Sequence, residues 1–295
     1  GMDYHIWQRL AVFGYLAAVA LSVAVMLFGR EINGSKRWLA LGPFSFQPSE
    51  FAKVALILFL ADLVTKNVKT IGKMWTLCRI MFWILPIVGL VGASNLSTAI
   101  IILGIGVILI FVASPKYAQF ALMGIAGACF MGIFLALESY RLERLAIWRN
   151  PEKYEKGYQT LQGLYAIGSG GVFGVGIGNS VQKLGFVPEA QNDMIFSIIC
   201  EELGLAGAGI IVFLFLLLIW RFFLIASGSR DLFGALIATG AMAHMMIQVI
   251  LNIAVVTNTI PNTGITLPFI SYGGTSVMFL LIEMGLVLSV SQVVD

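Results

Sequence analysis

Long apolar stretches separated by short polar connections dominate the sequence. A helix of about 20 apolar residues crosses a hydrocarbon core of about 30 Å. By this measure, apolar helices are predicted over residues 8–28, 51–65, 77–93, 98–113, 118–137, 195–220, 232–256 and 275–293. Segments 51–65 and 98–113 are short for that thickness, and 77–93 with 98–113 also fits a broken or re-entrant unit. The pattern predicts an all-α polytopic membrane protein with about eight transmembrane helices, forming a single membrane domain over residues 1–295.

Composition excludes the main alternatives to a membrane protein. Of the 295 residues, 59% are hydrophobic and 11% are charged, with a mean hydropathy of +0.94. Soluble domains carry about 25% charged residues, so neither an ordinary soluble enzyme nor a disordered chain fits. The net charge of +3 is too mild to predict a nucleic-acid partner. The three cysteines lie far apart in apolar stretches, so no metal or disulfide spacing is present.

Lys and Arg are distributed unequally between the two sets of connections. Cytoplasmic loops of membrane proteins carry the excess of positive charge. The connections on the side of the N-terminus hold Arg9, Lys66, Lys69, Lys73, Arg79, Lys116, Arg221 and Arg230. The short connections on the other side hold Arg30, Lys36 and Arg37, with Lys53 just inside a helix. We therefore expect a multi-pass protein of the cytoplasmic membrane with both termini in the cytoplasm.

One connection is much longer than the others. Residues 138–194 are predicted to lie outside the cytoplasm and hold about a third of the charged residues of the chain. Long loops are commonly functional, and binding groups concentrate on loops held by a rigid scaffold. Candidate chemistry is therefore expected in this extracytoplasmic loop.

The first polar motif surrounds the start of the 51–65 helix. It consists of a Lys-Arg-Trp run at 36–38 and GPFSFQPSE at 42–50, followed by Lys53. Glu50 and Lys53 are spaced to pair on one helix face. One interpretation is an interfacial loop with the tryptophan as a membrane anchor. The other is that Arg37 and Lys53 present cations to a phosphate-bearing lipid, because a lysine inside a span needs a partner or a water-filled cavity.

The second motif is rich in glycine. Residues 168–178 read GSGGVFGVGIG and are followed by Asn-Ser-Val-Gln and Lys183. The spacing matches neither a dinucleotide fingerprint nor a P-loop. A closely packed loop is one interpretation, and backbone amides that bind a pyrophosphate together with Lys183 are the other.

Two further motifs frame the segment before the 195–220 helix. Asp193 either caps that helix or serves as a general base, and Glu201 and Glu202 follow within the helix. The uncharged stretch 260–276 contains two prolines and three glycines. Non-helical backbone of this kind at membrane depth must be buried in protein or line a water-filled cavity. A substrate groove and a structural plug both satisfy that requirement.

Together, these motifs resemble the SEDS family of bacterial cell-wall polymerases (shape, elongation, division and sporulation proteins). The resemblance runs in order from about residue 8 to 293. It rests on GPFSFQPSEFAK at 42–53, Glu143-Arg144, Gly157-Tyr158-Gln159, IGSGGVFGVGIGNSVQK at 167–183, PEAQND at 188–193, EELG at 201–204 and TGITLPFISYGGTS at 263–276. The GNS-x-QK segment at 178–183 is most similar to the FtsW and SpoVE branch of division and sporulation proteins.

The resemblance implies a peptidoglycan glycosyltransferase. Such an enzyme polymerises lipid II, an undecaprenyl-pyrophosphate-linked disaccharide peptide, into glycan strands at the outer face of the membrane, beside a class B penicillin-binding protein. Asp193 is the implied catalytic base. The expected substrate-binding residues are Arg37, Gln47, Glu50, Lys53, Lys183, Ser271 and Tyr272. No metal site and no tightly bound cofactor are expected, although Mg²⁺ or Mn²⁺ bridging pyrophosphate and carboxylate stays open.

The sequence also departs from the family pattern. Family members read Pro-Asp-Leu-Gly-Thr where this chain reads Ser-Asn-Leu-Ser-Thr at 94–98, and Asn192 replaces a threonine. The resemblance implies ten spans, of which the first two are expected to be lacking here. These departures keep two alternatives open: a flippase or transporter of lipid II, and a non-catalytic scaffold for a penicillin-binding protein. The transporter alternative rests on the charges of Asp62, Glu201 and Glu202, which would lie in a water-filled cavity.

Overall fold

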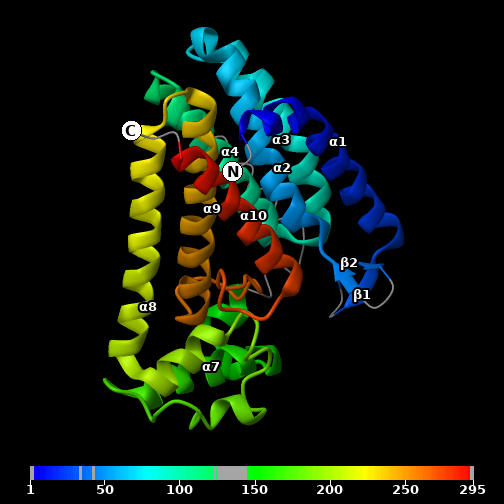
Figure 1. The fold of residues 1–295 in the computed structure, drawn as a ribbon. Coiled ribbons are helices and arrows are strands. Elements are labelled where there is room, and N and C mark those ends of the chain that lie inside the picture. Colours follow the sequence, from blue (N-terminus) through cyan, green and yellow to red (C-terminus); the bar gives the residue numbers. More distant parts are fainter. Residues whose placement is uncertain (1–2, 33–34, 42–43, 122–123, 125–144, 293–295) are drawn as a thin grey trace. The chain divides into compact units, whose positions relative to one another are not determined.

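A computed structural model describes residues 3–32, 35–41, 44–121, 124 and 145–292. Most of the predicted 118–137 helix, and the Glu143-Arg144 pair, therefore lie outside the described residues. The chain forms two compact units (Figure 1), and each is described by itself. Unit 1 comprises residues 1–119, 219–247 and 273–295, and unit 2 comprises residues 120–218 and 248–272.

Unit 1 is built around one buried helix. Its helices are α1 (His5–Phe28), α2 (Pro48–Asn67), α3 (Met74–Ser94), α4 (Leu96–Ala113) and α10 (Gly274–Ser291), with a short 3₁₀ turn η1 (Val68–Thr70) after α2. Helix α2 packs against α1, α3, α4 and α10, so most of its residues are buried. Tyr15 of α1 stacks on Phe59 of α2, and Trp83 of α3 meets both rings edge-on. Aromatic packing therefore fixes the contact between α1, α2 and α3.

A small antiparallel sheet joins α1 to α2. Its strands are β1 (Arg30–Ile32), β2 (Ser35–Leu41) and β3 (Phe44–Phe46), in the order β1-β2-β3. An interfacial loop was one of two interpretations of this segment, and neither included the strands. They are short, and their two-residue alternation is masked by the polar Lys-Arg-Trp run, so periodicity alone gives little signal.

Unit 2 contains the described part of the long loop. The loop forms 3₁₀ turns η2 (Pro151–Lys153), η3 (Glu155–Gly157) and η4 (Gln182–Leu184) and helix α7 (Tyr158–Gly170), and then enters α8 (Ile195–Gly228). Helix α8 is interrupted at Gly204, whose φ of 67° is not helical. Helix α9 (Leu232–Val256), of which residues 248–256 belong to this unit, is followed by an irregular stretch up to Tyr272.

The helices agree with the predicted all-α membrane fold. Among the described residues, six helices are long and apolar enough to cross a membrane: α1, α3, α4, α8, α9 and α10. Helix α2 covers the predicted 51–65 segment but carries Glu50, Lys53, Asp62 and Lys66. Helices α3 and α4 are each of spanning length, which favours two full spans over a re-entrant unit. The total of eight spans stays a prediction.

Candidate functional site

Asp193 lies in a tight turn directly before α8 and is 7% exposed. Its nearest side-chain donor is the Gln159 amide of α7, whose Nε2 lies 3.4 and 3.5 Å from the two carboxylate oxygens. Burial raises the pKa of Asp193 to about 6, the negative charge of Glu189 adds to the increase, and the hydrogen bond from Gln159 opposes it. A carboxylate with a pKa near 6 is ionised at neutral pH and is still basic enough to accept a proton.

The turn that carries Asp193 is bound to the irregular stretch 257–272. The Asn252 side-chain amide of α9 donates to the backbone carbonyls of Asp193 (2.8 Å) and Ile265 (2.6 Å). The Ser271 hydroxyl donates to the Asn192 carbonyl at 2.6 Å, and the Tyr272 amide donates to the Gln191 carbonyl at 2.8 Å. These bonds hold the backbone on both sides of the carboxylate. Ser271 therefore positions the turn that carries Asp193 by binding the backbone of that turn.

A cavity of about 630 Å³ opens beside this turn in unit 2. Its polar lining consists of Lys183, Glu189, Gln191, Asn192 and Tyr272. The Tyr272 side chain is 76% exposed, so its ring is available to a ligand. The cavity thus brings together two of the predicted substrate-binding residues, Lys183 and Tyr272, next to the turn that carries Asp193. A space of this size accommodates a sugar-sized ligand.

Two glutamates of α8 fix the segment that carries Lys183. The buried Glu201 carboxylate accepts hydrogen bonds from the Ser180 hydroxyl and from the amides of Val181 and Gln182. The Glu202 carboxylate pairs with the Lys183 ammonium at 2.6 Å. Asp62, in unit 1, pairs with Lys66 at 2.6 Å and accepts a hydrogen bond from Gln8. The three acidic residues behind the transporter alternative therefore all have local structural partners.

A second group of charges is buried in unit 1. Lys53 of α2 pairs with Glu50 one turn earlier at 2.9 Å, as its spacing predicted, and both side chains are buried. His244 of α9, also buried, contacts Glu283 of α10 at 2.8 Å and interacts electrostatically with Glu50. Glu283 lies 39 positions further along the chain, so no local sequence pattern links it to His244.

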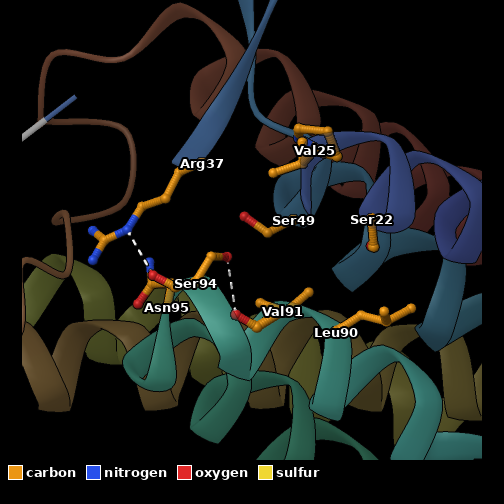
Figure 2. Close-up of a pocket in the computed structure, with 9 residues that line it drawn as sticks. Ser22, Val25, Arg37, Ser49, Leu90, Val91, Ser94 and Asn95 are labelled. Atoms are coloured by element: carbon orange, nitrogen blue, oxygen red, sulfur yellow. Dashed lines mark hydrogen bonds between the residues drawn. The ribbon is translucent and has the colours of Figure 1, made fainter. Parts of the chain in front are cut away.

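Arg37 lies on β2 beside a small crevice of about 20 Å³ in unit 1 (Figure 2). Its Nε donates to the carbonyl of Ser94 at the end of α3, at 3.2 Å. The neighbouring Asn95 caps α4, because its side-chain oxygen accepts a hydrogen bond from the Thr98 amide at 3.2 Å. An asparagine in place of the family's aspartate therefore still supplies the capping acceptor. Gln47 is half-buried at the N-cap position of α2 and makes no side-chain cap.

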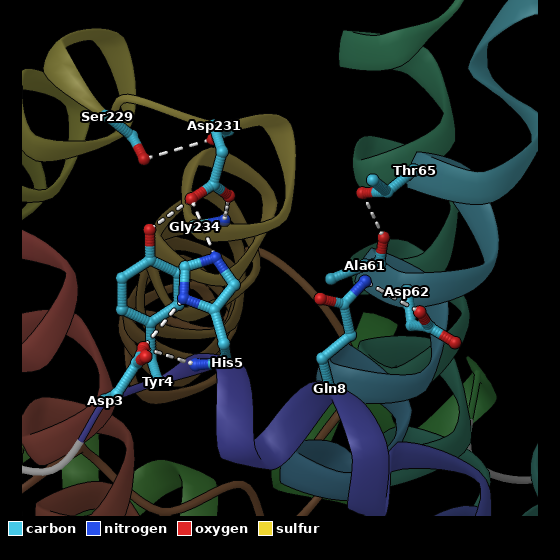
Figure 3. A network of polar contacts seen from close by, with 10 residues as sticks. All are labelled: Asp3, Tyr4, His5, Gln8, Ala61, Asp62, Thr65, Ser229, Asp231 and Gly234. Atoms are coloured by element: carbon cyan, nitrogen blue, oxygen red, sulfur yellow. Dashed lines mark hydrogen bonds and ion pairs between the residues drawn. The ribbon is translucent and has the colours of Figure 1, made fainter.

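A further polar network surrounds the start of α1 (Figure 3). The Tyr4 hydroxyl donates to Asp231, and His5 Nε2 lies 3.2 Å from the same carboxylate. Burial alone would raise the pKa of Asp231, but the hydrogen bonds from Tyr4 and the Gly234 amide and the nearby His5 outweigh it and lower that pKa. This network ties the beginning of α1 to the connection between α8 and α9.

The predicted site residues fall into two groups. Unit 2 holds Asp193, Lys183, Ser271 and Tyr272, and unit 1 holds Arg37, Gln47, Glu50 and Lys53. Gln159 and Asn252 bond to Asp193, but sequence reasoning noted Gln159 only as part of a family motif and did not single out Asn252. A polar side chain within an apolar helix was the available signal for Asn252. Within the described residues, no group of three or more His, Cys, Asp or Glu side chains is gathered to hold a metal ion.

The comparisons with known proteins point to one family. The model of the FtsW/RodA/SpoVE family, described as cell cycle protein, matches residues 1–295. Stage V sporulation protein E of Bacillus subtilis (strain 168) is 40% identical, over 99% of this chain and 81% of that protein. A probable peptidoglycan glycosyltransferase FtsW of Coxiella burnetii (strain RSA 493 / Nine Mile phase I) is 37% identical, over 97% of this chain and 79% of that protein.

Two solved structures are similar over nearly the whole chain. A chain from a peptidoglycan synthase complex, described as coordinating polymerization and crosslinking, matches with a TM-score of 0.84 and 29% identity, over 99% of this chain and 83% of that one. The rod shape determining protein RodA of Thermus thermophilus matches with a TM-score of 0.71 and 28% identity, over 99% of this chain and 80% of that one.

Proposed function

Because this chain belongs to the FtsW/RodA/SpoVE family of cell cycle proteins, we propose that it is a peptidoglycan glycosyltransferase that polymerises lipid II into glycan strands at the outer face of the cytoplasmic membrane. The observation that carries the proposal is the environment of Asp193. A buried carboxylate with a pKa of about 6 lies beside a cavity large enough for a sugar.

In the proposed reaction, Asp193 removes a proton from the acceptor sugar hydroxyl. The oxygen attacks the anomeric carbon of the donor sugar, the bond to the pyrophosphate oxygen breaks, and undecaprenyl pyrophosphate leaves with the electron pair. Because the leaving group is already a good one, cations matter more than a general acid. Lys183 in unit 2 and Arg37 and Lys53 in unit 1 are the proposed cations, with Gln47 and Glu50 as further substrate contacts.

Two consequences concern the surroundings of the enzyme. The distribution of Lys and Arg supports cytoplasmic termini and an external Asp193. The similarity to a chain of a peptidoglycan synthase complex supports assembly with a class B penicillin-binding protein.

Identities of 40% and 37% to SpoVE and FtsW proteins support the division and sporulation branch.

A polymerisation assay tests the proposal. Purified protein is incubated with lipid II, with and without the partner, and with Mg²⁺, Mn²⁺ or a chelator, and the products are separated by size. We expect glycan strands from the wild type and none from Asp193→Ala or Asp193→Asn. Glu152→Gln, an exposed change in the same loop, is the matched control and should polymerise like the wild type. Normal strands from Asp193→Asn would exclude Asp193 as the base.

The same preparation separates the two alternatives. Lipid II that crosses a proteoliposome membrane without polymer formation would indicate a transporter. A wild-type protein that binds its penicillin-binding protein but makes no polymer would indicate a scaffold. Glycan strands that depend on Asp193 exclude both as the sole function.

A further inference from the structure

The glycine-rich segment between α7 and α8 exposes large apolar side chains. Phe173 is 84% exposed, Ile177 81% and Leu184 75%. Further exposed apolar residues of the segment are Val172, Val175, Val181 and Phe186. Lys183 is the one charged residue between positions 171 and 186, and its ammonium is paired with Glu202. A contiguous apolar face with so little charge normally has a covering surface.

This segment cannot turn its apolar side chains inward, because its backbone is bound to α8. The amides of Val175 and Gly176 donate to the carbonyls of Glu201 and Glu202 at 2.9 and 3.0 Å. The amides of Leu205 and Ala206 donate back to the carbonyls of residues 171 and 172, at 2.9 and 3.0 Å. Gly174, at a φ of 79°, has no room for a Cβ, which would clash with the Glu202 carbonyl. The loop and the start of α8 therefore form one rigid piece.

The same piece continues into an exposed apolar surface of α8. After the interruption at Gly204, α8 runs on through Gly228, about 36 Å at 1.5 Å per residue, which is enough to cross the hydrocarbon core. Leu205 is 72% exposed at the start of this span, and Ile210, Phe213 and Leu214 are also exposed along it. The glycine-rich segment thus adjoins α8 at the end of that helix that carries the loop (Figure 1).

The backbone of the segment is suited to an apolar boundary. Irregular backbone is excluded from lipid unless its polar groups are satisfied within the protein. The amides of Ser180, Val181 and Gln182 donate to the carboxylates of Glu201 and Glu202, and the Gly174 and Leu184 amides donate to nearby carbonyls. More than half of the amide donors of the segment are therefore satisfied within the protein.

We propose that residues 171–186 form an interfacial anchor that inserts Phe173, Ile177 and Leu184 into the outer leaflet, at the boundary between headgroups and acyl chains. The anchor connects directly to the Lys183 side of the cavity beside Asp193. It sets the depth of the catalytic turn relative to the headgroup region, where the pyrophosphate of a lipid-linked substrate lies. This consequence for catalysis rests on the proposed function, whereas the insertion itself does not.

Depth measurements by electron paramagnetic resonance test the insertion. The full chain, with Cys78, Cys129 and Cys200 changed to serine, carries a nitroxide at Phe173→Cys or Ile177→Cys. It is reconstituted into vesicles of phosphatidylethanolamine and phosphatidylglycerol. We expect these labels to collide more with oxygen than with a water-soluble nickel chelate. Glu155→Cys, an exposed position of the same loop, is the matched control and should show the reverse.

Two results would overturn the anchor. Labels at positions 173 and 177 that behave like the label at 155 would place the segment in water. Labels that become shielded only when a penicillin-binding protein is added would identify the face as a protein interface. Neither result depends on turnover, so the anchor can fail while the proposed function stands.

A second measurement tests the role in catalysis. The double variant Phe173→Ser, Ile177→Ser should polymerise lipid II several-fold more slowly than the wild type in vesicles and at the wild-type rate in detergent, which imposes no fixed depth. An equal loss in both media would overturn the depth role. If the wild type itself made no polymer, the proposed function would fail. The depth measurement would still show whether residues 171–186 insert into the membrane.

Discussion

Asp193 combines burial with an incomplete set of hydrogen bonds. Its carboxylate accepts long hydrogen bonds from Gln159 and hydrogen bonds from the backbone amides of Asp193 and Met194, which offset only part of the effect of burial, and its backbone carbonyl accepts from Asn252. A carboxylate in such surroundings is poorly stabilised in its charged form, which raises its pKa. The sequence pointed to this aspartate through its motif but could not predict the pKa. Burial and the contact with Gln159 involve segments far from Asp193 along the chain, whereas Glu189 belongs to the same motif.

The first prediction concerns the pH dependence of polymerisation. If ionised Asp193 is the base, the rate should fall about tenfold per pH unit below its pKa of about 6 and level off above it. Glu189→Gln removes a nearby negative charge, so the midpoint should move to lower pH. Gln159→Ala removes a hydrogen bond to the charged form, so the midpoint should move to higher pH. Initial rates of lipid II consumption between pH 4.5 and about 8 measure these shifts. Shifts in the same direction for both variants would contradict this assignment.

The second prediction concerns the buried ion pair of α2. Lys53→Met leaves the Glu50 carboxylate buried without its partner and should lower the free energy of unfolding by about 3–5 kcal/mol. The double variant Glu50→Gln, Lys53→Met removes both charges and should recover most of the loss. Thermal unfolding in detergent measures the difference. A single variant as stable as the wild type would show that the pair is not stabilising.

At the scale of elements, glycines decide how the long loop meets α8. From the sequence, both a closely packed loop and a phosphate-binding loop stayed open, because both need glycine. The structure shows the amides of Val175 and Gly176 bonded to α8, and Gly174 and Gly204 at positive φ where the two backbones meet. Close backbone packing therefore explains these glycines.

The third prediction compares two glycines of this region. Gly174→Ala should lower the free energy of unfolding by more than about 2 kcal/mol, because its Cβ clashes with the Glu202 backbone and its φ of 79° disfavours a side chain. Gly168→Ala, within α7 and with open space around it, should be neutral or slightly stabilising. Thermal unfolding and protease sensitivity of the loop provide the comparison. Equal effects at the two positions would argue against close packing.

At the scale of the whole molecule, apolar helices and scarce charges are arranged for a membrane. The six helices of spanning length agree with the apolar pattern within three residues at each end, except that α8 continues eight residues beyond the predicted end at 220. Helix α2 is the exception in composition, since it carries four charged residues and is buried by four neighbouring helices. Its charges are tolerated because Lys53 and Lys66 each have an acidic partner on the same helix.

The fourth prediction concerns orientation. In the cysteine-free background, Glu155→Cys should react with a membrane-impermeant maleimide in intact cells. Lys69→Cys, an exposed position in the connection between α2 and α3, should react only after permeabilisation. Mass spectrometry of the labelled protein measures both. The opposite pattern would place the long loop in the cytoplasm and exclude polymerisation of lipid II at the outer face.

The sequence by itself determined the membrane class, most helix boundaries and the family, because apolar length and ordered motifs are local properties. It also indicated the Glu50–Lys53 pair, whose partners lie one helical turn apart. Only the tertiary structure decided the partners of Asp193, Lys183 and His244, and it revealed the sheet before α2. The physical reason is that burial, the electrostatic environment of a side chain and hydrogen bonds to a distant backbone all depend on contacts between segments far apart in the chain. No local pattern encodes which distant carbonyl, carboxylate or amide will be adjacent after folding.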